Sequence, residues 1–241
     1  MPRKKPLEYK LEDLVSEYSQ EIYDEVSNEI EIDLLKDIKE GWSAKIENGR
    51  AIITYNKSNY PDACFAHELL HIKYELNGLV PPMIMDNEGV TEVLPIIFNQ
   101  LCHHKFYKEF YDMGFNEEEF LYDNDSYQIE LQARRDIKIL EDLHAKSGDI
   151  QGSVVLLLPY ISLISPHDQS EKTKSFIERL KKIGDTNFFN KVDAIIGDWV
   201  ASETLDSSLT LARLFKASNR PKVGFCISGN QADIITTMDV E

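Results

Sequence analysis

Two histidines and a glutamate have the spacing of a metal site in the segment His67-Glu68-Leu69-Leu70-His71. On a helix, residues four apart lie one above the other with Cβ atoms roughly 5–6 Å apart, so both imidazoles can converge on one ion. Glu68 is turned by about 100° from His67 and can reach a water molecule instead of the ion. A zinc ion would lower the pKa of that water toward about 7, so that Glu68 could act as general base. The pattern predicts metal-assisted hydrolysis.

The residues around this motif place it on a buried helix. The segment is rich in apolar side chains, namely Ala63, Phe65, Ala66, Leu69, Leu70 and Ile72. Burying two imidazoles and a carboxylate is costly unless a metal ion or hydrogen bonds satisfy them. The alternative is a helix that carries two histidines by coincidence, and the apolar surroundings disfavour it.

The stretch Ala66–Ile72 resembles the active-site helix of the zincin metallopeptidases. Among these, the small cytoplasmic ImmA/IrrE-like peptidases are the most similar in character. The resemblance covers residues 40–115, although its specific part is the five-residue motif. It implies a zinc metalloprotease, a hydrolase that cleaves a protein or peptide substrate, and an edge strand that binds the extended substrate by β-augmentation. The metzincin subgroup is excluded, because His71 is not followed by x-x-G-x-x-H.

The third metal ligand is left with three candidates. In glutamate-type zincins it comes from a second helix some twenty residues downstream, and by this resemblance Glu92 is the first choice. Glu88 is the competitor, because Asn87-Glu88 and Glu92 are similar to a thermolysin-like signature. His103 is the third, because on a continuous helix Glu92, Asn99 and His103 fall within about 40° of each other. Its neighbour His104 faces another way and is expected at the surface.

We expect an α+β fold that is mostly helical, with a zincin-like core made of a small N-terminal antiparallel sheet and the active-site helix. Asn48-Gly49 suits a tight hairpin turn between two strands. Pro61 suits the first turn of the motif helix, and Gly78 suits its end. Further predicted elements are a helix over 11–29, a helix from near Leu94 to Asp112, helices over 126–146, 170–183, 188–200 and 206–217, and two short strands over 222–227 and 232–237.

The polar stretch 145–153 suggests a boundary between two domains. Residues 1–146 would form the zincin-like metallopeptidase domain. Residues 147–241 would form a mostly helical C-terminal region, in which no chemistry is recognised.

The composition excludes several kinds of partner. The chain of 241 residues has a formal net charge of −16 and no basic stripe, so we expect no nucleic-acid binding. No apolar run approaches the roughly 20 residues of a membrane span. Three widely spaced cysteines fit a reduced, cytoplasmic protein and exclude a cysteine-based zinc knuckle.

Two other classes of protein compete with the enzyme. One is a regulatory or interaction protein that holds zinc for structure and has no turnover. The other is a helical binding protein without a metal. The substrate and the oligomeric state are not indicated by the sequence.

Overall fold

A computed structural model describes the chain over residues 8–37, 41–85, 92–120, 125–147, 154–164, 170–219, 223–226 and 235–236. The chain divides into two compact units. Unit 1 comprises Met1–Asn77 and Phe106–Tyr127, and unit 2 comprises Gly78–Lys105 and Gln128–Glu241. Each unit is built from two separate stretches of the sequence, whereas the two predicted domains, 1–146 and 147–241, are each one continuous stretch. The predicted boundary at residue 147 stays a prediction.

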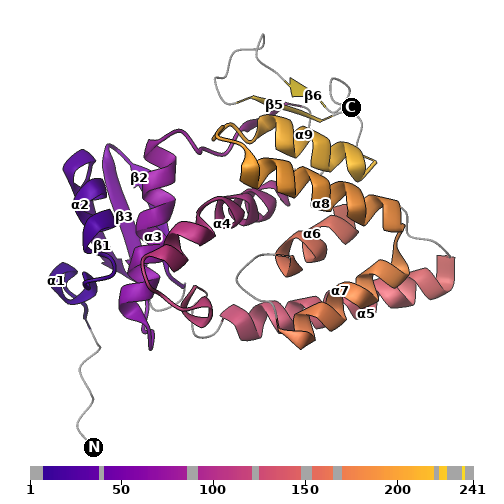
Figure 1. Cartoon of the computed structure of the whole chain (residues 1–241), viewed down its shortest axis with the longest axis horizontal. Helices are drawn as coiled ribbons and strands as arrows, with labels where there is room; N and C mark the ends of the chain where they lie inside the picture. Colours follow the sequence, from indigo (N-terminus) through magenta and orange to yellow (C-terminus); the bar gives the residue numbers. More distant parts are fainter. Residues whose placement is uncertain are drawn as a thin grey trace, which may run out of the picture. The chain divides into compact units, whose positions relative to one another are not determined.

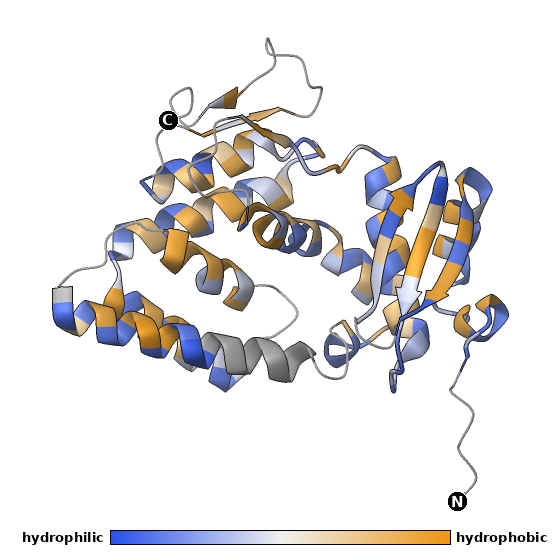
Figure 2. Cartoon of the chain, turned by 180° about the vertical axis from the view of Figure 1, so that it is seen from behind, coloured by the Kyte–Doolittle hydropathy of each residue, from blue (hydrophilic) through white to orange (hydrophobic). Residues whose placement is uncertain are grey.

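Unit 1 contains a three-stranded sheet in the order β1-β3-β2 (Figure 1). The hairpin prediction is confirmed, because β2 and β3 are antiparallel and both Asn48 and Gly49 have positive φ angles. The prediction of an all-antiparallel sheet is not met, because β1 joins β3 in parallel. Central strand β3 is largely apolar along its length (Figure 2). The strands are Glu31–Lys36 (β1), Ser43–Glu47 (β2) and Arg50–Tyr55 (β3).

The first predicted helix is interrupted. Helix α1 spans Leu11–Leu14 and helix α2 spans Gln20–Glu29. Between them the Ser19 hydroxyl accepts a hydrogen bond from the Ser16 backbone amide, at 3.0 Å. Such local side-chain bonds compete with the helical pattern of the backbone, which explains a break that the apolar periodicity does not reveal.

The two helices that matter for the site have the predicted ends. Helix α3 spans Pro61–Leu76 and is followed by Gly78 at φ +102°, the left-handed conformation expected of a helix end. It packs against α2 and the sheet, and Ala51, Ile53 and Tyr55 of β3 are buried. Helix α4 spans Leu94–Asp112 and runs without a break from unit 2 into unit 1.

Unit 2 is mainly helical. The indole N–H of Trp199 donates to the Leu101 carbonyl, and the Lys105 ammonium donates to the Trp199 and Ser202 carbonyls, which fixes α8 against α4. A small antiparallel sheet, β4-β5-β6, links the start of the unit to its end. The elements are Met83–Met85 (β4), Asp125–Ser147 (α5), Val154–Leu163 (α6), Glu171–Ile183 (α7), Thr186–Ala201 (α8), Ser208–Ala217 (α9), Gly224–Cys226 (β5) and Ile235–Thr236 (β6).

The structure confirms the predicted fold class, a mostly helical α+β protein. Within the described residues, no helix combines the length and the apolar character needed to cross a bilayer.

Candidate metal centre

The predicted motif lies on a regular buried helix. His67 and Glu68 of α3 are 3% and 2% exposed, and the neighbouring residues Phe65, Ala66 and Leu69 are fully buried. His71, one turn after His67, is half-buried. The helix thus holds both imidazoles in place through its packing, as a metal site requires.

The two imidazoles face each other. The Nε2 atoms of His67 and His71 lie 3.2 Å apart. Two nitrogens bound to one tetrahedral zinc at the usual bond length are separated by about 3.3 Å. The pair therefore has the spacing that a shared ion demands.

The protonation of His67 is set by a distant part of the chain. Its Nδ1 atom lies 2.8 Å from the carbonyl oxygen of Phe120, which follows the short 3-10 helix η1 (Glu117–Glu119). Because a carbonyl can only accept, Nδ1 carries the proton, and the neutral ring leaves the Nε2 lone pair for a ligand. Metal-binding histidines are commonly oriented in this way.

Burial keeps both rings neutral. It lowers the pKa of His67 to about 4, and the hydrogen bond to the Phe120 carbonyl opposes this effect without cancelling it. The pKa of His71 is also lowered well below its usual value, first by burial and then by the proximity of His67. A histidine must be neutral to bind a metal, and both rings already meet this condition at neutral pH.

Aromatic rings pack against the histidine pair. Phe106 meets the His71 ring edge-on at 4.8 Å between centroids and the His67 ring at 5.6 Å. Phe120 lies 4.6 Å and Phe110 6.3 Å from the His67 ring. Apolar rings in contact with the imidazoles leave less room for water, which strengthens electrostatic interactions there.

A third histidine completes the group. One ligand nitrogen from each of His67, His71 and His103 lies within 4.8 Å of the others. His103 precedes Phe106 by about one turn on helix α4. Three imidazoles are a donor set that zinc and other transition metals accept. The structure thus places three histidines in position to bind a metal ion.

Asn99 lies next to His103. Its side-chain amide nitrogen is 3.4 Å from Nε2 of His103, one turn away on α4. The contact is long for a hydrogen bond, but it is in the right place to orient the ring.

The other predicted ligands are placed differently. Glu92 is exposed just before α4 and is not part of the histidine group. Pro95 accounts for this, because the helix begins only at Leu94 and does not carry Glu92 on the face of His103. Glu88 lies outside the described residues.

The sequence did not reveal two further features, the burial of His104 and the contact made by the Phe120 carbonyl. His104 is 8% exposed and not at the surface, and burial lowers its pKa to about 4 despite a hydrogen bond to the Ile161 backbone. Helix α4 is packed on more than one side, so adjacent positions can both be buried. The Phe120 carbonyl carries no sequence signal, because any residue supplies one.

Comparison with known proteins finds no matching family model, no matching curated protein and no matching solved structure. What can be inferred about function therefore rests on the residues of this chain.

Proposed function

We propose that this protein is a zinc-dependent metallopeptidase, with His67, His71 and His103 as metal ligands and Glu68 as general base. The observation that carries the proposal is the group of three histidine nitrogens, two of which come from the helix that also carries Glu68. The His-Glu-x-x-His spacing that resembles the zincins supports it.

The ligand set favours a catalytic site over a closed structural one. Structural zinc sites have four protein ligands, whereas catalytic sites have three and keep one position open. Three histidines would provide this arrangement. Glu92 and Glu88, proposed from the sequence as alternatives to His103, are not needed in it.

Glu68 would move the proton. It takes a proton from the attacking water and hands it to the amine that leaves when the peptide C–N bond breaks. Zinc, when bound, would polarise the substrate carbonyl and increase the acidity of water. The rings of Phe106 and Phe120 would keep bulk water from the histidines and preserve a low dielectric around the developing charge.

A peptide substrate is supported by the sheet of unit 1. Strand β2 is an edge strand in the described sheet, with β3 as its neighbour. An extended peptide could add to such an edge through backbone hydrogen bonds, with its carbonyls in a regular row.

A cytoplasmic location is supported by the cysteines. All three lie in the described part of the chain, are buried and form no disulfide. Disulfides are rare in reducing compartments, so three buried cysteines without a disulfide suit a reducing compartment such as the cytoplasm.

The burial of the motif favours a second candidate, a regulatory protein that holds zinc without turnover. His67 and Glu68 are almost fully covered, as in a site that stabilises a fold. This candidate predicts bound metal, but no hydrolysis.

A peptide library tests the proposal across many substrate sequences at once. The zinc-loaded protein is incubated with a proteome-derived peptide mixture, and new termini are identified by mass spectrometry. The proposal predicts new termini that disappear with a chelator and in Glu68→Gln. A zinc-loaded protein that generates none would contradict the enzyme and support the structural role.

A further inference from the structure

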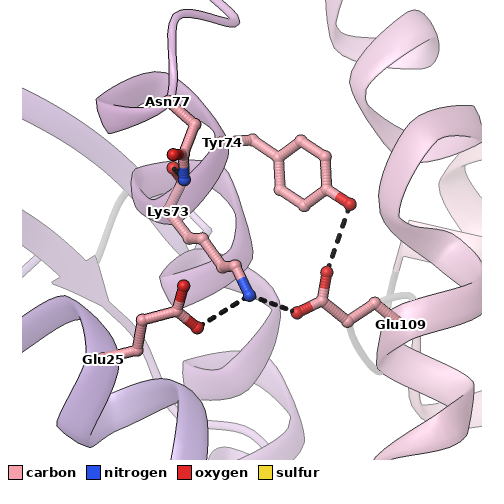
Figure 3. A network of polar contacts seen from close by, with 5 residues as sticks. All are labelled: Glu25, Lys73, Tyr74, Asn77 and Glu109. Atoms are coloured by element: carbon pink, nitrogen blue, oxygen red, sulfur yellow. Dashed lines mark hydrogen bonds and ion pairs between the residues drawn. The ribbon is translucent and has the colours of Figure 1, made fainter. Parts of the chain in front are cut away.

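A network of charges in unit 1 connects three helices close to the histidines. The Lys73 ammonium on α3 lies 2.7 Å from a carboxylate oxygen of Glu25 on α2 and 2.7 Å from Oε1 of Glu109 on α4. The Tyr74 hydroxyl donates to the other oxygen of Glu109, at 3.1 Å. Figure 3 shows the Glu109 carboxylate held between these two neighbouring residues of α3.

The network is sheltered and has matched partners. The side chains of Lys73 and Glu109 are 21% and 31% exposed. Burial lowers the pKa of Lys73, but its hydrogen bonds to Glu109 and Glu25 outweigh this effect and the net change is upward. Burial, together with the charge of Glu109, raises the pKa of Tyr74 to about 12. Lysine and tyrosine are therefore both protonated donors at neutral pH.

The geometry links this network to the metal centre through both helices. On α3, Lys73 and Tyr74 follow His71 within one turn. On α4, Glu109 follows His103 by six residues, or about 9 Å along the axis. Phe106 lies between His103 and Glu109 in the sequence of α4. The centroid of its ring is 4.8 Å from that of His71 and 5.6 Å from that of Tyr74. A helix is stiff over this length, so fixing Glu109 also fixes the height of His103.

We propose that Glu109, held by Lys73 and Tyr74, is a positioning residue for the metal centre. It sets the position of α4 along α3, so that His103 meets the pair formed by His67 and His71. Apolar contacts such as those of Phe106 are non-directional, and they define the register of α4 less sharply than directional bonds do. Two directional bonds from adjacent residues to one carboxylate define a single register. This proposal rests on the metal centre proposed above.

Zinc affinity measured by chelator competition tests the idea. Glu109→Ala should weaken zinc binding roughly 10- to 100-fold, the usual effect of removing a group that orients ligands. Asp112→Ala is the matched control, because Asp112 is an acid of the same helix that pairs with an exposed lysine, Lys108. It should leave the affinity unchanged.

A double-mutant cycle separates positioning from general destabilisation. If Glu109 acts through His103, then Glu109→Ala should cause no further loss of zinc affinity in a protein that already carries His103→Ala. The cobalt(II)-loaded Glu109→Ala protein should show the weaker, altered visible absorption of His103→Ala. Equal losses in both backgrounds would overturn the proposal. If Glu109→Ala does not fold, as judged by circular dichroism, Glu109→Gln and Tyr74→Phe are used in the same cycle.

The outcomes distinguish this proposal from the one on which it rests. A wild-type protein that binds zinc, with Glu109→Ala equally tight, contradicts the positioning role alone. A wild-type protein that binds no zinc contradicts the metal centre, and the positioning role with it.

Discussion

Nδ1 of His67 lies 2.8 Å from the carbonyl oxygen of Phe120, a residue 53 positions further along the chain. This bond fixes the tautomer of the histidine and turns its Nε2 toward His71. It also makes the segment that ends at Phe120 part of the site, although that segment contributes no ligand. The chemistry of the centre therefore depends on packing of unit 1 as well as on the motif.

Replacing Glu68 by glutamine should separate catalysis from metal binding. The amide cannot accept a proton from water, so peptide hydrolysis should fall by at least roughly 100-fold. Zinc content should stay the same, because Glu68 is not among the three histidines proposed as ligands. Glu75→Gln on the same helix is the control, with activity retained. Hydrolysis that survives in Glu68→Gln would rule out its role as general base.

The metal-free protein should lose stability in mild acid. Burial lowers the pKa of His104 to about 4, while in the unfolded chain it is close to 6.5. Between these values the unfolded state binds more protons, so the free energy of unfolding falls as the pH drops from about 6.5 to about 4. The loss attributable to this residue is on the order of 3 kcal/mol.

Urea unfolding in the presence of a chelator, from pH 8 to pH 4, measures this effect. His104→Leu removes one titrating group and should flatten the decline, and its stability at pH 8 gives the separate cost of repacking. A decline as steep in His104→Leu as in wild type would show that His104 does not contribute.

Two glycines should respond to alanine with opposite signs. Gly114 has φ +107°, and an added Cβ would lie 2.9 Å from the Tyr18 ring. Gly114→Ala should cost about 1–2 kcal/mol, the penalty of a left-handed conformation. Gly197 lies inside α8 with open space around it, so Gly197→Ala should stabilise by about 0.5–1 kcal/mol. Thermal unfolding of both variants checks the pair, and a Gly114→Ala protein as stable as wild type would contradict the predicted strain.

The sequence was most informative where local chemistry decides the structure. The hairpin at Asn48-Gly49 and both ends of α3 follow from turn and capping residues, and the structure confirms them. Strand β1 was missed, because its parallel pairing with β3 depends on contacts distant in sequence and not on alternating polarity.

In the candidate site, too, local features could be predicted from the sequence and tertiary ones could not. The motif histidines could be found from spacing alone, and the helical angle made His103 a candidate. The choice of Glu92 over His103 came from a resemblance, and the start of α4 leaves Glu92 exposed. The Phe120 carbonyl and the contact of Lys73 with Glu109 are tertiary features for which no local pattern exists.

Metal analysis of the zinc-reconstituted protein after removal of excess ion bears most directly on the three-histidine centre. Wild type should contain about one zinc per chain. His67→Ala and His71→Ala should lose it, and His103→Ala should bind it more weakly. His144→Ala, a histidine of α5, should retain a full complement. Wild type without zinc, or His67→Ala and His71→Ala variants that retain it in full, would contradict the metal centre and the hydrolase built on it.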